Sequence, residues 1–120
     1  MKNVLVVDDE MVLRMLIVDS LEDLDCTVDE AENGMEAIKK INETNYDVMI
    51  LDYMMPELTG IELLGEIDSD RIKETYVLML TAKTQEKDQV QAKEAGVDYF
   101  MKKPFSPMEL YQIVEELIND

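Results

Sequence analysis

The most constraining feature of the sequence is a set of three short apolar runs that each end at a polar residue. They occupy residues 4–7 before Asp8, residues 48–51 before Asp52, and residues 77–80 before Thr81. Continuous apolar runs of this length are typical of strands buried on both faces of a parallel sheet. We therefore predict three central strands, with Asp8, Asp52 and Thr81 at the points where these strands emerge.

Two segments of mixed polarity, residues 27–31 and 97–101, are predicted to be edge strands. Amphipathic helical patterns follow the strands, and we expect the first helix over residues 11 to about 24 and the fourth from about Thr84 to Ala95. Helix boundaries are marked by three capping pairs and one glycine stop: Asn33 with Glu36, Thr59 with Glu62, Ser106 with Glu109, and Gly96. The last helix is expected to run to about Ile118.

Strand and helix alternate five times with short connections, which predicts a parallel sheet with right-handed crossovers. Placing the three apolar strands centrally and the two polar ones at the edges gives the order 2-1-3-4-5. This is the doubly wound, flavodoxin-like (βα)5 arrangement of the α/β class, in which ligands bind beside the carboxyl ends of the first and third strands. The chain is long enough for one core, so residues 1–120 are expected to form a single domain.

Composition excludes several classes of function. The net charge of −17 makes nucleic-acid binding by this domain improbable, because phosphate backbones require clustered Lys and Arg. The sequence contains no histidine, which removes histidine metal sites and catalytic triads. No apolar run is long enough for a membrane span, and the single cysteine, Cys26, cannot form an internal disulfide. We therefore expect a cytoplasmic protein without membrane association.

The predicted topology brings Asp8, Asp9 and Asp52 to one edge of the sheet. An acidic cluster before a helix commonly does no more than complement the helix dipole. Three carboxylates at one strand edge, however, repel one another unless a cation lies among them. Oxygen ligands without histidine or thiolate favour Mg²⁺ or Mn²⁺ over zinc or copper.

Asp52 is a candidate nucleophile at the same edge, because an aspartate can accept a phosphoryl group to form an aspartyl phosphate. Thr81 and Lys103 are expected nearby, where a hydroxyl and an ammonium can hold phosphoryl oxygens. Taken singly, Thr81 is equally consistent with a turn residue and Lys103 with a surface lysine before a helix. Their order along the chain, at the predicted strand ends, favours a common site.

Over nearly its whole length the sequence resembles the response-regulator receiver domains of two-component signalling. The matching segments are Val6-Val7-Asp8-Asp9-Glu10, Leu51-Asp52-Tyr53-Met54-Met55-Pro56 with Gly60, Leu80-Thr81-Ala82, Ala95-Gly96-Val97-Asp98, and Lys103-Pro104-Phe105. The resemblance implies that Asp52 is the phosphoacceptor, that Asp9 and Asp52 bind Mg²⁺ directly, and that Asp8 acts largely through water. It also implies that the Met54 backbone carbonyl completes the protein ligands.

The resemblance further implies that Thr81 hydrogen-bonds the phosphoryl group and that Lys103, rather than Lys102, pairs with it. The Lys103–Pro104 bond is expected to be cis. The resemblance also implies a switch in which an aromatic residue three positions before this lysine turns inward on activation, which makes Phe100 a candidate switch residue alongside Thr81. Simple packing at the edge of the sheet is the alternative for Phe100.

The function implied is a signalling switch that takes a phosphoryl group from a histidine kinase or a histidine phosphotransfer protein and turns over no external metabolite. The alternative is an Mg²⁺-dependent phosphohydrolase, which would normally carry a second aspartate at position 54, where this chain has Met54. A flavodoxin-like electron carrier is disfavoured, because Asp8 and Asp9 would repel the phosphate of FMN. Neither Met54 nor Lys83 is suited to orient an attacking water, which predicts a long-lived phosphorylated form.

The chain is consistent with a stand-alone shuttle, a chemotaxis-type regulator, or a receiver that belongs to a longer protein with its own output domain. A monomer and a phosphorylation-dependent dimer are both compatible with the sequence.

Overall fold

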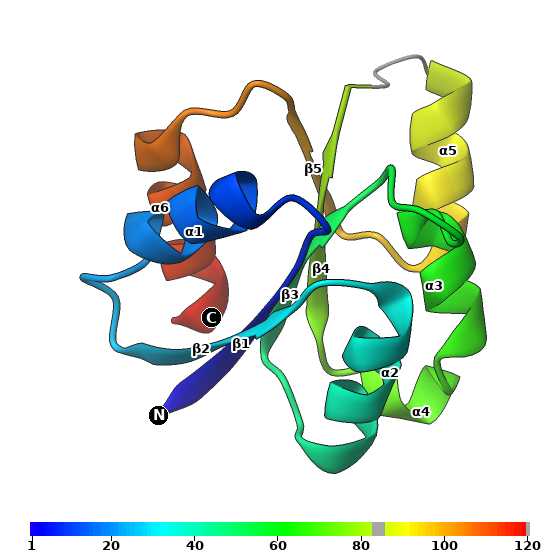
Figure 1. Cartoon of the computed structure of the whole chain (residues 1–120), viewed down its shortest axis with the longest axis horizontal. Coiled ribbons are helices and arrows are strands. Elements are labelled where there is room, and N and C mark those ends of the chain that lie inside the picture. Colours follow the sequence, from blue (N-terminus) through cyan, green and yellow to red (C-terminus); the bar gives the residue numbers. More distant parts are fainter. Residues whose placement is uncertain (83–85, 120) are drawn as a thin grey trace.

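Five parallel strands form one sheet in the predicted order β2-β1-β3-β4-β5, and helices cover both of its faces (Figure 1). The structure is a computed structural model that describes residues 1–82 and 86–119. In chain order the elements are β1 (Lys2–Val7), α1 (Met11–Ser20), β2 (Cys26–Ala31), α2 (Gly34–Glu43), β3 (Val48–Asp52), α3 (Gly60–Glu66), α4 (Ser69–Ile72), β4 (Tyr76–Thr81), α5 (Glu86–Ala95), β5 (Tyr99–Lys102) and α6 (Pro107–Ile118).

The three central strands supply both layers of the core, because successive side chains of a strand point to opposite faces. One layer packs against α2, α3 and α5, and its strand residues are Leu5, Val7, Met49, Leu51, Val77 and Met79. The other packs against α1 and α6, and its strand residues are Val4, Val6, Val48, Ile50, Leu78 and Leu80. Figure 1 shows α1 and α6 together on one side of the sheet, and α2 to α5 on the other. Burial on both faces explains the continuous apolar runs in the sequence.

The predicted helix caps are present. The Thr59 side chain accepts from the Glu62 backbone N–H while the Glu62 side chain accepts from that of Thr59, which completes a capping box at the start of α3. At the start of α2, the Asn33 side chain accepts from the Glu36 backbone N–H. Gly96, with φ of +110°, ends α5 where a side chain would be strained. Among the helices of the described residues, none is long and apolar enough to cross a bilayer.

One predicted helix boundary is wrong, one lies outside the described residues, and one short helix was not predicted. The first helix ends at Ser20 instead of Leu24, although Leu21 and Leu24 still pack into the core as the apolar pattern predicts. The Ser20 hydroxyl donates to the Leu16 carbonyl, and acidic rather than basic residues follow, which disfavours continuing the helix. The short helix α4 was not predicted. The predicted start of the fourth helix at Thr84 lies outside the described residues, and α5 is described from Glu86.

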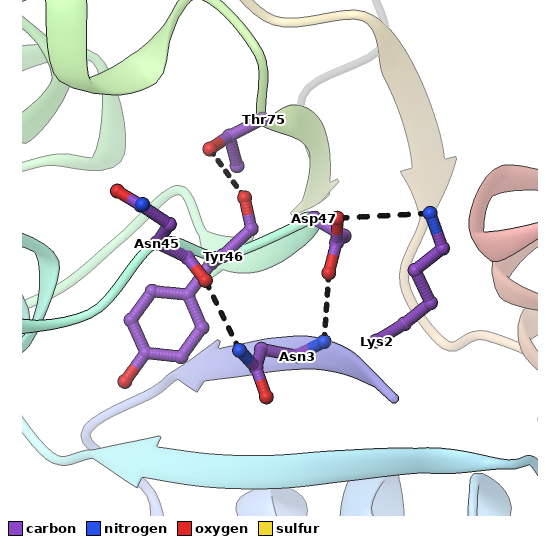
Figure 2. Close-up of polar contacts among 6 residues, drawn as sticks. All are labelled: Lys2, Asn3, Asn45, Tyr46, Asp47 and Thr75. Carbon is purple, nitrogen blue, oxygen red and sulfur yellow. Dashed lines mark hydrogen bonds and ion pairs between the residues drawn. The ribbon is translucent and has the colours of Figure 1, made fainter.

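Polar contacts tie the amino ends of the central strands together (Figure 2). The Asp47 carboxylate accepts from the Asn3 backbone N–H at 2.8 Å, and the Asn3 side chain donates to the Asn45 carbonyl at 3.2 Å. The Thr75 hydroxyl donates to the Tyr46 carbonyl at 2.7 Å. These bonds join the segments before β3 and β4 to each other and to β1, at the end of the sheet opposite the polar residues predicted to form a site.

Candidate functional site

The carboxyl ends of the three central strands meet at one edge of the sheet and carry the buried polar side chains. In residues 1–82 and 87–119, the buried polar or charged residues are Asp8, Asp52 and Thr81, with 0%, 2% and 3% of their surface exposed. Asp8 follows β1, Asp52 ends β3, and Thr81 ends β4. The structure thus brings together the three polar residues with which the apolar runs of the sequence end.

Asp8, Asp9 and Asp52 form an acidic cluster in which one carboxylate oxygen from each lies within 4.8 Å of the other two. Oδ1 of Asp8 accepts from the Glu10 backbone N–H at 2.9 Å, whereas its Oδ2 is buried without a hydrogen-bond partner. Burial raises the pKa of Asp8 to about 6, and the nearby Asp52 carboxylate adds to the rise while the Glu10 hydrogen bond opposes it. An ionised carboxylate in this position needs a further partner.

Lys103 supplies a positive charge to this cluster. Its Nζ lies 2.6 Å from Oδ1 of Asp52, and its backbone N–H donates to the Thr81 carbonyl at 3.0 Å. Burial raises the pKa of the Asp52 carboxyl, and the Lys103 ammonium offsets part of that rise. Lys102, by contrast, is exposed on β5. The Lys103–Pro104 bond is cis, as predicted.

The donor set fits a hard divalent cation. All three clustered side chains offer carboxylate oxygens, which Mg²⁺ and Mn²⁺ prefer. The buried Oδ2 of Asp8 is an acceptor that a cation, or a water bound to one, would satisfy. Among the described residues, the cluster of three carboxylates has one ion pair, that of Asp52 with Lys103, so a divalent cation would relieve repulsion that this ammonium does not neutralise.

A close approach of backbone segments fixes the end of β3. The Gly60 N–H donates to the Tyr53 carbonyl at 2.7 Å. A Cβ atom on Gly60 would lie 2.8 Å from the Asp52 carbonyl oxygen and 2.9 Å from Cε of Met79. Position 60 therefore requires glycine, because any side chain would push α3 away from the strand end that carries Asp52.

Two further predicted site residues are described, Met54 directly after β3 and Phe100 on β5. Met54 follows β3 and is 61% exposed, and its backbone is hydrogen-bonded to Asp52. Phe100 is half-buried and packs against the core layer of α2, α3 and α5, whereas the neighbouring Tyr99 is 46% exposed. Lys83, the other position predicted to affect phosphoryl lifetime, lies outside the described residues.

Arg14 contacts the site although the sequence analysis did not identify it. Its Nη1 donates to the Asp8 carbonyl at 2.8 Å, and its Nε lies 3.0 Å from Oε1 of Glu30. The signal that could have found it is its charge, because Arg14 is the sole basic residue of α1, in a helix that is otherwise mostly apolar.

The protein is a doubly wound α/β protein, and its acidic cluster lies at the carboxyl ends of the neighbouring strands β1 and β3. This is the topological switch point, where folds of this class bind their ligands. The family model described as "Response regulator receiver domain" matches residues 4–115. The chain belongs to this family of two-component signalling domains. The members of the family that it matches are signalling proteins rather than metabolic enzymes.

Among similar sequences, the transcriptional regulatory protein ResD of Bacillus subtilis (strain 168) is 48% identical over 116 residues, which span 97% of this chain and 48% of that protein. The transcriptional regulatory protein SrrA of Staphylococcus aureus (strain NCTC 8325 / PS 47) is 39% identical over 116 residues, which span 97% of this chain and 47% of that protein. The chain therefore spans about half the length of the curated relatives it matches.

Among solved structures, chemotaxis protein CheY4 of Vibrio cholerae matches with a TM-score of 0.90 and 32% identity, over 98% of each chain. Response regulator protein TrrA of Thermotoga maritima, solved in complex with Mg²⁺-BeF, matches with a TM-score of 0.82 and 38% identity, over 98% of this chain and 99% of that one. These likenesses confirm the predicted fold.

Proposed function

We propose that this receiver domain is a phosphorylation-activated switch in which Asp52 accepts a phosphoryl group from a histidine kinase or a histidine phosphotransfer protein. The observation that carries the proposal is the environment of Asp52. Its carboxylate is buried at a strand end, is paired with Lys103 at 2.6 Å, and lies in one cluster with Asp8 and Asp9. This arrangement combines a nucleophile, a cation for phosphoryl oxygens and oxygen ligands for a metal.

The chemistry follows from these groups. A carboxylate oxygen of Asp52 attacks the phosphorus of phosphohistidine, a P–O bond forms, and the P–N bond breaks as the imidazole leaves. Asp8, Asp9, Asp52 and the Met54 carbonyl would hold Mg²⁺ or Mn²⁺, which supplies neutralisation of the phosphoryl charge. Lys103 and the Thr81 hydroxyl are the proposed contacts of the phosphoryl oxygens. The Mg²⁺-BeF complex of TrrA supports this assignment, because that relative shares the fold and 38% of the sequence.

The state of Asp52 would reach the surface through Thr81 and Phe100. Thr81 ends the strand beside β3, and Phe100 packs half-buried on β5 against the same core layer as Met79. A shift of Thr81 toward a phosphoryl group would leave space that Phe100 can fill by turning inward. An output protein or output domain would recognise the change at these two residues. Residues 1–120 would act as one receiver unit in the cytoplasm.

Labelling with radioactive acetyl phosphate tests the phosphoacceptor. The wild type should incorporate label in the presence of Mg²⁺ and none when EDTA is present from the start, and Asp52→Asn should incorporate none under either condition. The matched control is Asp23→Asn, an exposed carboxylate in the turn after α1, which should label like the wild type. Label retained by Asp52→Asn would refute the assignment. Rapid multiple turnover of acetyl phosphate would favour the phosphohydrolase alternative.

A further inference from the structure

Arg14 closes the loop that carries two of the three clustered carboxylates. Its backbone N–H donates to the Glu10 carbonyl at 2.9 Å, at the start of α1. Its guanidinium Nη1 donates to the Asp8 carbonyl at 2.8 Å. One residue therefore binds the carbonyl at each end of the segment formed by residues 8–10, and Asp9 lies between these two attachment points.

The guanidinium is itself held in place by β2. Its Nε lies 3.0 Å from Oε1 of Glu30, and the Arg14 side chain is only 12% exposed. The backbone N–H of Asp8 donates to the carbonyl of Ala31, the residue after Glu30, at 3.1 Å. Asp8 is thus attached to the end of β2 both directly and through Arg14.

We propose that Arg14, oriented by Glu30, is a positioning residue for divalent-cation binding at the cluster of Asp8, Asp9 and Asp52. By holding the Asp8 carbonyl, it sets the direction in which the Asp8 and Asp9 side chains leave the backbone and keeps both facing Asp52. Oδ2 of Asp8 has no hydrogen-bond partner of its own. Its position is therefore set by the backbone of Asp8 and by the hydrogen bond that Oδ1 accepts from Glu10. The inference rests on the proposed function, because it takes Mg²⁺ as the ligand of the cluster.

The contact geometry requires arginine rather than any cation. Nε and Nη1 of one planar guanidinium reach two acceptors at once, the Glu30 carboxylate and the Asp8 carbonyl. A lysine at position 14 would keep the charge but offers one nitrogen on a flexible chain. Comparing Arg14→Lys with Arg14→Met therefore separates positioning from simple charge.

The experiment measures the Mg²⁺ dissociation constant from amide chemical shifts of the full chain during titration with MgCl₂, at a temperature where every variant is folded. Arg14→Met and Arg14→Lys should each bind Mg²⁺ about 10-fold more weakly than the wild type, the low end of what loss of a residue supporting metal ligands causes. Glu30→Ala, a change at a partly exposed side chain, should weaken binding in the same direction. In all three variants the amides of residues 8–10 should shift before any metal is added.

The matched control is Arg71→Met, because Arg71 also donates from its guanidinium to a backbone carbonyl, that of Ile41, away from the cluster. This variant should keep the wild-type Mg²⁺ affinity even if its melting temperature falls, which separates positioning from loss of stability. Wild-type affinity in Arg14→Met, Arg14→Lys or Glu30→Ala would overturn the inference alone. Absence of Mg²⁺-dependent shifts in the wild type would overturn the proposed metal site with it.

Discussion

Replacing Asp8 with asparagine should make the metal-free protein more stable while removing its response to Mg²⁺. Asparagine has the shape of aspartate and keeps an Oδ1 that can accept from the Glu10 N–H. Its NH₂ group would replace Oδ2, which is buried without a partner, and could donate to the neighbouring carboxylates. The substitution therefore removes a desolvated charge without opening a cavity.

The magnitude follows from the pKa of Asp8. Folding raises the pKa of the Asp8 carboxyl from 3.8 to about 6. At 1.36 kcal/mol per pKa unit, ionised Asp8 makes the folded protein less stable above pH 7 by about 3 kcal/mol than it would be with Asp8 protonated. Asp8 is 0% exposed, so solvent does not screen this effect. Because the pKa of Asp8 is higher in the folded state, proton binding by Asp8 stabilises the folded protein. This stabilisation is fully present below about pH 4 and is lost as the pH rises through 6.

Urea unfolding in EDTA checks this expectation. Asp8→Asn should be more stable than the wild type by about 3 kcal/mol at pH 7.5, and the gap should narrow to about 1.5 kcal/mol at pH 5, where the folded wild type binds the proton. A Mg²⁺ concentration 100 times the dissociation constant adds about 2.7 kcal/mol to the wild type. Asp8→Asn should gain much less, so that Mg²⁺ nearly closes the gap at pH 7.5.

The control is Asp9→Asn, which alters an exposed carboxylate of the same cluster. It should weaken the response to Mg²⁺ without a comparable gain of stability in EDTA, because Asp9 is not desolvated. The reasoning is wrong if Asp8→Asn is less stable than the wild type in EDTA at pH 7.5, or if the gap between them does not depend on pH.

Three further substitutions test the surroundings of Asp52. Gly60→Ala should lower the free energy of unfolding by about 1–3 kcal/mol, because its Cβ would overlap the Asp52 carbonyl; urea unfolding at wild-type stability would contradict that close approach. Lys103→Met should slow acetyl phosphate labelling of Asp52 at saturating Mg²⁺ while leaving the protein folded by circular dichroism; an unchanged labelling rate would exclude Lys103 as a phosphoryl contact. Met54→Asn should speed the loss of label from Asp52, because an amide can orient an attacking water; loss no faster than in the wild type would contradict the predicted role of Met54.

The predictable part of this molecule is the part that depends on burial and on chain direction. Buried parallel strands must be apolar throughout, so the runs before Asp8, Asp52 and Thr81 were visible in the sequence as central strands. The carboxyl ends of parallel strands meet at one edge, so the meeting of these three residues followed from the topology. The capping box of Thr59 and Glu62 was visible because it joins residues close in sequence.

The features that the sequence did not predict depend on the direction of single side chains and on where a helix gives way to a turn. Whether Arg14 reaches the Asp8 carbonyl depends on the rotation of α1 about its axis, which its apolar pattern specifies only coarsely. The apolar periodicity correctly predicted that Leu24 is buried but wrongly predicted that it is helical. The turn after Ser20 still packs Leu24 into the same core layer as Ile17 of α1, so the pattern continues past the end of the helix. Asp8 and Asp9 look alike in sequence, yet one is fully buried and the other exposed.

Lys103 links three strand ends, and under the proposed function this would make it central to the response of the domain to phosphorylation. Its ammonium binds Asp52 on β3, its backbone N–H binds the Thr81 carbonyl on β4, and it follows β5 directly. A phosphoryl group on Asp52 would compete for the ammonium but not for the backbone bond, so Lys103 would turn toward the new oxygens while remaining attached to Thr81. Movement would then pass to β4 and β5 rather than to β3, which the Gly60 contact holds in place. The half-buried Phe100, three residues before Lys103 on β5, lies on that route.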